Sequence, residues 1–340
     1  MPIHALPISR RGFLAGSAAL LASAQFGPSC WATEGTGEKW ALLADVHLIH
    51  PSIIPKLPPK EQSDGKKKAP QIRQRLAQVV SEISLLKEPP TGVILNGDCA
   101  HVGTPADYKL LLSLFDKLFQ AKTPVHFTLG NHDHRTNFIN SRSKQSSLVH
   151  ERCVSIMETE RANWVLLDSL SMKDPGSTGA VQPWSHIQGI GRLGKEQLQW
   201  LIETLDKDVE KPALIVAHHN IAPSKEFLAR FHDKTTHVVD PISGLGSLEG
   251  GLEDTDPFLE VVLARKHVKA VFCGHKHRFE IRKWNGVYFV FLPAVGYPSG
   301  PKEAVGWLEC DLSDQGMKIK THTLDHRHPH SGKTVDLSWT

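Results

Sequence analysis

The sequence has little of what builds disulfide scaffolds, thiolate metal sites or polyanion-binding surfaces. The five cysteines are odd in number and form no Cys-x-x-Cys pair, which argues against a disulfide framework and a zinc–thiolate site. They are Cys30, Cys99, Cys153, Cys273 and Cys310. Charge of one sign is also lacking, because 39 lysines and arginines face 36 aspartates and glutamates, a formal net charge of +3. The chain has a single lysine run, Lys66-Lys67-Lys68, so it provides little positive surface for the phosphates of a nucleic acid. We therefore expect no stable nucleic-acid partner.

Long hydrophobic runs are missing too. The apolar stretch over residues 15–26 is too short to span a bilayer permanently, so we expect no transmembrane anchor in the mature chain. The six residues before it, Ser9-Arg10-Arg11-Gly12-Phe13-Leu14, resemble a twin-arginine export signal; an ordinary Sec signal or an amphipathic arm is the alternative. The first interpretation predicts a bacterial protein that uses the twin-arginine translocase and resides in the periplasm or outside the cell. Residues 1–36 would be the signal and a short linker, and residues 37–340 the functional domain.

What is abundant is histidine, with 20 residues against 3 tyrosines, and this points to imidazole chemistry or a metal. Hydrophobic residues make up 40% of the chain and charged residues 22%, a globular composition that excludes wholesale disorder.

Apolar strands and amphipathic helices alternate along the chain. The strands are expected at 39–44, 92–95, 125–129, 163–167, 213–217, 268–273 and 286–291. The helices are expected after residue 70, after Thr104 as N-cap, at 195–205 and at 258–265, and a loop is expected at 51–70. This order predicts one α/β domain with a strand-rich last third.

Residues of metal-ligand type follow five of these strands. They occur in Asp45-Val46-His47, Gly97-Asp98, Gly130-Asn131-His132-Asp133, His218-His219 and Gly274-His275-Lys276-His277. Because the carboxyl ends of strands in an open α/β sheet share one edge, these side chains can meet at one place.

Two of the motifs have ligand types two residues apart. On an extended backbone such residues point to the same side, which predicts that both members of each pair face one cluster. The glycines at 97, 130 and 274 would let the backbone bend and the metals approach. Oxygen and imidazole ligands without thiolate suit Mn, Fe, Zn or a mixed pair, and their number suits two ions bridged by a carboxylate.

In this order, the five motifs resemble the signature of the calcineurin-like metallophosphoesterase superfamily. The resemblance spans residues 45–277 and implies a four-layer αββα sandwich of two mixed β-sheets flanked by helices. It implies one metal held by Asp45, His47, Asp98 and His277. It implies a second held by Asp98, Asn131, His218 and His275, with Asp98 bridging.

The resemblance also implies a reaction. A hydroxide bridging two divalent or trivalent ions would attack the phosphorus of a small phosphodiester or phosphomonoester in line. His132 would assist the leaving group, and Asp133 would orient His132. A non-catalytic binding module on the same fold is the alternative. Such scaffolds usually lose ligands or the histidine of the Asn-His pair, and His132 is present.

Departures from the family pattern narrow the substrate class. The run after Gly97-Asp98 lacks the Asp-Arg-Gly of the protein Ser/Thr phosphatases. The purple acid phosphatases lack the first-motif histidine and have a tyrosine after their bridging aspartate, so they do not fit either. The remaining resemblance is to bacterial phosphodiesterases acting on cyclic nucleotides or glycerophosphodiesters, and to nonspecific phosphomonoesterases. The Gly-x-Gly-x-x-Gly run at 189–194 is interpreted as a loop, because no buried strand is evident before it.

Overall fold

The two six-stranded β-sheets of the protein are both mixed, with parallel and antiparallel strand pairs. A computed structural model describes residues 37–142, 148–149, 151–171, 189–230 and 251–339. In the first six-stranded sheet the order is β14-β13-β12-β1-β2-β3, with β1, β2 and β3 parallel. These strands span Glu38–Ala44 (β1), Gly92–Asn96 (β2), Val125–Thr128 (β3), Gly306–Ser313 (β12), Gly316–Thr323 (β13) and Thr334–Ser338 (β14).

The second six-stranded sheet has the order β10-β11-β9-β8-β7-β6, and its four inner strands are parallel. They span Ser155–Glu158 (β6), Asn163–Leu166 (β7), Ala213–Val216 (β8), Val268–Cys273 (β9), Glu280–Trp284 (β10) and Val287–Phe291 (β11). Strand β8 is buried at every position, as expected for a parallel strand covered on both faces.

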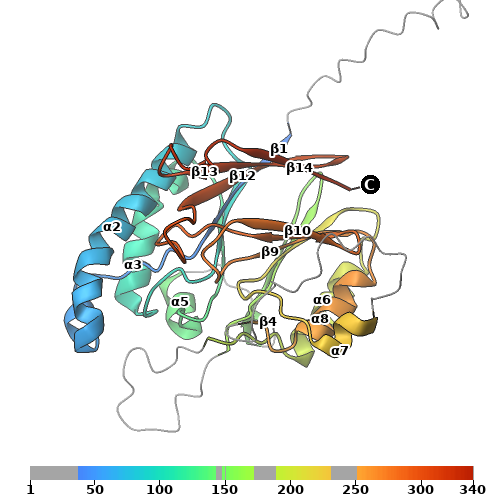
Figure 1. Ribbon diagram of the computed structural model, residues 1–340, viewed down its shortest axis with the longest axis horizontal. Coiled ribbons are helices and arrows are strands. Elements are labelled where there is room, and N and C mark those ends of the chain that lie inside the picture. The colour runs from blue at the N-terminus through green and yellow to red at the C-terminus, as the bar shows by residue number, and fades with distance from the viewer. Residues whose placement is uncertain (1–36, 143–147, 150, 172–188, 231–250, 340) are drawn as a thin grey trace, which may run out of the picture. The chain divides into compact units, whose positions relative to one another are not determined.

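Helices cover the outer face of each sheet, which gives four layers (Figure 1). Helices α2 (Pro59–Ser84) and α3 (Pro105–Leu114) pack on the first sheet through one apolar cluster, and α6 (Lys195–Leu205) and α8 (Thr255–Leu263) pack on the second through another. A third cluster, which includes Trp40, Trp164 and Phe272, fills the space between the sheets. The predicted fold class is therefore confirmed.

Short elements complete the described residues. They are a 3-10 turn at Ile54–Lys56 (η1), helices Asp116–Gln120 (α4), Arg135–Ser141 (α5) and Lys225–Arg230 (α7), and the strand pair Leu148–Val149 (β4) and Arg152–Cys153 (β5). Thr104 caps α3 as predicted, in a capping box with Asp107. The glycine run forms a loop from residue 189 onward, ending with Gly194 at the N-cap of α6.

The expected loop at 51–70 is wrong over its second half, because α2 begins at Pro59. A proline in the first helical turn removes no hydrogen bond that the helix would otherwise make. Pro70 lies inside the helix, where it does remove one, but its ring is on the exposed side. The early turns are held by Ala69, which packs in a small apolar cluster with Ile54 and Leu57. Tertiary packing thus overrides the local signal from Pro70.

The expected helix after Thr104 is interrupted. α3 ends at Leu114 and α4 begins at Asp116, with Phe115 between them. Leu118 lies in the core, whereas Phe119 is 40% exposed.

Among the described residues, no helix has both the length and the apolar content needed to cross a membrane. The predicted export signal lies in residues 1–36, outside the described residues.

Candidate metal centre

The predicted ligands meet where the carboxyl ends of both sheets' parallel strands come together. Asp45 follows β1, Asp98 follows β2, Asn131 follows β3, His218 follows β8 and His275 follows β9. Ligand atoms of Asp45, His47, Asp98 and His277 lie within 4.8 Å of one another, and so do those of Asp98, His218 and His275. The Oδ1 atom of Asn131 lies 3.0 Å from Nδ1 of His275. Two groups of donors therefore share Asp98.

One oxygen of Asp98 stands between the two groups. Its Oδ2 lies 3.3 Å from Nε2 of His47 and 3.4 Å from Nε2 of His218. The other oxygen, Oδ1, accepts a hydrogen bond of 2.9 Å from the backbone N–H of His132. The backbone of His132 thus holds the Asp98 carboxylate through Oδ1, while Oδ2 points towards both ligand groups.

The ring orientations fit a pair of cations. Nδ1 of His218 lies 3.0 Å from the carbonyl oxygen of Asn96, and Nδ1 of His277 lies 2.7 Å from that of Tyr297. Each ring therefore donates its Nδ1–H to a carbonyl, which leaves the Nε2 lone pair facing the cluster. Nε2 of His218 is buried and has no hydrogen-bond partner among the described residues. Nε2 of His277 lies 3.0 Å from Nε2 of His47, a close approach of two basic atoms that a shared cation explains.

The electrostatics favour positive charge here. Burial by itself would raise the pKa of Asp98, but the imidazoles of His218, His132 and His47 hold it well below its usual value. Burial likewise opposes a charge on His218, yet Asp98 and Asp45 outweigh it and raise the pKa of His218 to about 10. In the absence of metal, a proton is thus drawn to the position where a cation would bind.

The backbone at the ligands is not extended. The prediction that the two ligand pairs each lie on one face of an extended strand is therefore wrong. The φ angles are positive at all five of these positions: Asp45 (53°), His47 (51°), Asp98 (46°), His275 (68°) and His277 (51°). A left-handed conformation costs a non-glycine residue roughly 1–2 kcal/mol, and such strain gathers at functional sites. Hydrogen bonds between the loops hold it in place, among them His47 N–H to the Asp98 carbonyl oxygen at 2.8 Å.

The glycines beside the ligands make room for ligand side chains. A Cβ on Gly97 would lie 2.3 Å from Nδ1 of His218, and one on Gly130 would lie 2.3 Å from Oδ1 of Asp98. At Gly97 φ is also +68°, which disfavours any other residue.

His132 lies beside the cluster with its tautomer defined. Its Nδ1 lies 2.8 Å from the carbonyl oxygen of His101, so Nε2 is the nitrogen that can take up and release a second proton. The ring packs edge-on against His47, with centroids 4.5 Å apart, and stacks on His101 at 5.0 Å.

Asp133 is fully buried and acts on the backbone. Its two oxygens accept hydrogen bonds from the backbone N–H groups of Gly130, Cys99 and Ala100 at 2.9–3.1 Å, and from the hydroxyl of Tyr108 at 3.1 Å. Burial raises the pKa of Asp133 to about 6. These bonds tie the loop carrying Asn131 and His132 to the loop after Asp98. The bond that defines the His132 tautomer comes from His101 instead.

The sequence assigns no role to several residues near the site. The side chain of Asn96 is completely buried and bonds into the opposite sheet. His219 is also fully buried, with Nδ1 2.8 Å from the hydroxyl of Ser169. His101 and Tyr297 line a cavity beside His47. Only tertiary proximity identifies these residues.

Comparisons with known proteins agree with this geometry. Residues 39–279 match the family model described as calcineurin-like phosphoesterase. A probable cyclic nucleotide phosphodiesterase from Synechococcus is 25% identical over 244 residues, covering 71% of this chain and 80% of the relative. A 3',5'-cyclic adenosine monophosphate phosphodiesterase from Haemophilus influenzae is 24% identical over 253 residues, covering 71% of this chain and 77% of the relative.

A glycerophosphodiester phosphodiesterase from Enterobacter lignolyticus is 22% identical over 223 residues, covering 64% of this chain and 67% of the relative. Among solved structures, a dimetal phosphatase from Danio rerio superposes with a TM-score of 0.60 at 15% identity, covering 89% of this chain and 99% of that one, which shows the fold. The family match covers most of the chain and includes every predicted ligand, so the protein belongs to the calcineurin-like phosphoesterase family.

Proposed function

We propose that the protein is a dinuclear-metal phosphodiesterase in which His132 protonates the leaving alcohol. The observation that carries the proposal is the position of Asp98 Oδ2 between two histidine nitrogens of separate ligand groups, at 3.3 Å and 3.4 Å. Asp45, His47, Asp98 and His277 would hold one ion, and Asp98, Asn131, His218 and His275 the other. When bound, Mn, Fe or Zn ions would supply the hydroxide nucleophile and neutralise charge on the phosphoryl oxygens.

The chain's own residues contribute positioning and a proton. The carbonyl oxygens of Asn96 and Tyr297 keep the rings of His218 and His277 oriented, which spares the site reorganisation during the reaction. His132 would release a proton from Nε2 to the leaving oxygen as its bond to phosphorus breaks. General-acid assistance of this kind is worth about 10²–10⁴ in rate. Asp133 would support His132 by holding its loop.

A diester substrate is favoured by two considerations. The relatives from Synechococcus, Haemophilus influenzae and Enterobacter lignolyticus are described as phosphodiesterases. The site also opens into a cavity that is bordered by His132. The volume of this cavity, about 410 Å³, is within the usual size range of ligand sites.

The test uses the full chain, stripped with a chelator and reloaded with Mn, Fe or Zn. We expect two ions per chain by elemental analysis, and a higher kcat/KM for bis(4-nitrophenyl) phosphate than for 4-nitrophenyl phosphate. Asp98→Asn should abolish turnover, whereas Asp116→Asn, at an exposed position on α4, should not. Stable binding of two ions with no turnover of either ester would support the binding-module alternative.

We further propose that the chain is exported through the twin-arginine translocase. The support is the Arg10-Arg11 pair ahead of a modestly apolar stretch. Because this translocase carries folded proteins, the metals could be inserted before export. Cell fractionation of the Arg10→Lys, Arg11→Lys double variant should show retention in the cytoplasm. Continued export of that variant would contradict the proposed route. A mature protein that acquires its metal only outside would contradict metal insertion before export.

A further inference from the structure

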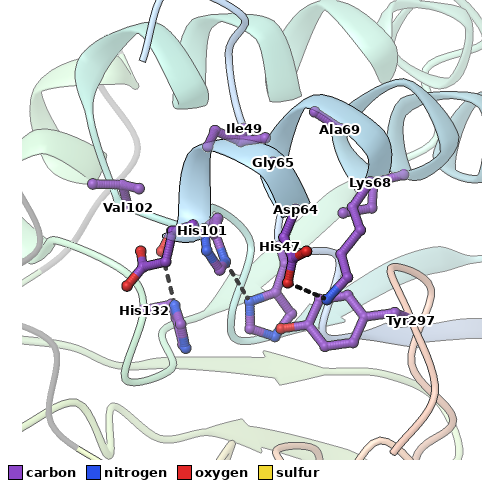
Figure 2. Close-up of a pocket in the computed structure, with 12 residues that line it drawn as sticks. His47, Ile49, Asp64, Gly65, Lys68, Ala69, His101, Val102, His132 and Tyr297 are labelled. Carbon is purple, nitrogen blue, oxygen red and sulfur yellow. Dashed lines mark hydrogen bonds and ion pairs between the residues drawn. The ribbon is translucent and has the colours of Figure 1, made fainter. Parts of the chain in front are cut away.

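A cavity beside the metal-ligand cluster is lined by histidines on one side and by apolar side chains on the other (Figure 2). His47, His101 and His132 form the reactive side, from the loops that follow β1, β2 and β3. Ala69 of α2 and Ile49 lie across the cavity from these histidines in Figure 2, and Ile72 and Val102 also line the cavity. All four of these apolar residues are buried, with exposed fractions of 5% or less. A neutral, apolar group would enter this space favourably, because its apolar surface is removed from water.

Three charged residues line the cavity, Glu61, Asp64 and Lys68, and all three are exposed residues of α2. Nζ of Lys68 lies 4.0 Å from a carboxylate oxygen of Asp64, one helical turn earlier on α2. The same ammonium lies 5.0 Å from the ring centroid of Tyr297, over its face. The side chains of Asp64 and Lys68 are more than half exposed, so their charges stay in water while the stem of Lys68 borders the cavity. With two carboxylates and one ammonium, all exposed to water, this part of the lining offers no net positive charge to an anionic leaving group.

The position of His132 decides which part of a substrate would occupy the cavity. A general acid must reach the oxygen of the departing alcohol, so that alcohol leaves from the side on which the acid lies. His132 borders the cavity on the same side as His47 and His101.

We infer that this cavity is the leaving-group subsite, and that α2 makes the protein selective for phosphodiesters whose leaving alcohol is bulky, neutral and apolar, such as an aryl alcohol. The inference rests on the proposed function, because it takes His132 as the acid. It assigns substrate selection to the segment around Ala69, where the sequence alone predicts a loop.

The experiment compares variant with wild type on three diesters, so that the intrinsic reactivity of each ester cancels. Methyl 4-nitrophenyl phosphate is the reference. Methyl 4-methylumbelliferyl phosphate enlarges the leaving group, and phenyl 4-nitrophenyl phosphate enlarges the group that is retained. Ala69→Leu narrows the cavity and Val102→Ala widens it. Ala77→Leu, on an exposed position of the same helix, is the matched control.

Ala69→Leu should lower kcat/KM for the 4-methylumbelliferyl ester about tenfold more than for the reference, since added methyl groups in an apolar pocket discriminate by 10-fold or more. Val102→Ala should shift the ratio the other way, and Ala77→Leu should leave it unchanged. The phenyl ester should follow the reference in every variant. Thermal melts confirm folding. An unchanged ratio in both cavity variants, or an effect on the phenyl ester instead, would overturn the inference.

A binding measurement separates this inference from the proposed function. 1-Naphthylphosphonate cannot be hydrolysed at its carbon–phosphorus bond, and calorimetry gives its affinity for the metal-loaded chain relative to methylphosphonate. Ala69→Leu should weaken the naphthyl compound alone. If no diester is turned over, the proposed function fails, and this affinity still decides whether the apolar group enters the cavity. Equal weakening of both phosphonates, or of neither, would contradict the subsite.

Discussion

The imidazole of His218 is held by the main chain of Asn96, a residue of the other sheet. Nδ1 of His218 lies 3.0 Å from the Asn96 carbonyl oxygen, although the two residues are 122 positions apart. The Asn96 amide nitrogen reaches the carbonyl oxygens of Ala217 and Phe272 at 3.2 Å and 3.3 Å, and its Oδ1 accepts from the hydroxyl of Thr128 at 2.7 Å. The side chain of Asn96 therefore connects the two sheets by hydrogen bonds beside the metal centre.

Replacing that side chain should loosen both the fold and the site. Asn96→Ala removes this partner from the buried carbonyl oxygen of Ala217 and the buried hydroxyl of Thr128, whereas the Phe272 carbonyl oxygen keeps the N–H of Ala217; each group left unpaired costs roughly 1–3 kcal/mol. We expect a lower urea midpoint and a 10–100-fold weaker metal affinity, the usual size of an effect on residues that orient ligands. Asn140→Ala, on an exposed position of α5, should change neither quantity. Wild-type metal affinity in Asn96→Ala would refute the link between the two sheets and the site.

Removing the metal should lower the melting temperature. Ions that bind only the folded chain stabilise it by about 2.7 kcal/mol at a concentration 100 times their dissociation constant, which corresponds to several degrees in a protein of this size. Calorimetric scans with a chelator, and with Mn, Fe or Zn restored, measure the shift. Asp98→Asn should melt at the same temperature under both conditions. A wild-type melt that ignores the chelator would count against the metal centre.

His132→Ala should retain the metals but lose activity. The loss of the proton donor should reduce kcat by about 10²–10⁴, and most for esters with poor leaving groups, because 4-nitrophenolate departs without needing a proton. Steady-state kinetics on 4-nitrophenyl and phenyl diesters, with metal content measured in parallel, provide the test. His326→Gln, at an exposed position far along the chain, is the control. Equal losses on both esters would remove His132 from its role as acid.

His126 on β3 should make stability depend on pH away from the metal centre. Burial, helped by the charge of Arg142, lowers the pKa of His126 to about 4 from 6.5. Between these pH values the unfolded chain binds more protons at this residue than the folded chain does. His126 therefore leaves the free energy of unfolding unchanged above about pH 6.5 and lowers it as the pH falls towards 4. Urea titrations from pH 4 to 7 should show a smaller loss in His126→Gln than in wild type. Parallel curves for the two proteins would show that His126 does not titrate in this window.

The sequence predicts that the ligands lie close together, because each strand and the ligand residue that follows it can be recognised from the local sequence. Asp45, Asp98 and His218 each follow an apolar run, and parallel strands bring such ends together. The path of the backbone at Asp45 and His47 was not predictable in the same way. Its left-handed conformation depends on hydrogen bonds to the loop after β2, which no local pattern encodes.

The start of α2 and the roles of Asn96 and Asp133 escape prediction for a related reason. Pro70 gives a strong local signal against a helix, and contacts made in the fold outweigh it, among them the packing of Ala69 in its apolar cluster and the hydrogen bond from Gln62 to the Leu57 carbonyl oxygen. The sequence gives Asn96 no role, and it predicts that Asp133 orients His132 rather than holding the backbone of two loops. Their importance comes from partners that the fold brings near, such as Phe272 for Asn96 and Cys99 for Asp133.

The placement of the thiols has a consequence for where the chain can fold. Cys99 and Cys153 lie in the cluster under α2 and α3, Cys273 in the cluster under α6 and α8, and Cys310 between the sheets. All four are free and buried. The described part of the chain therefore depends on no covalent cross-link, and oxidants have little access to these sulfur atoms. It can reach its native state in a reducing compartment and remain unaltered when transferred to an oxidising one.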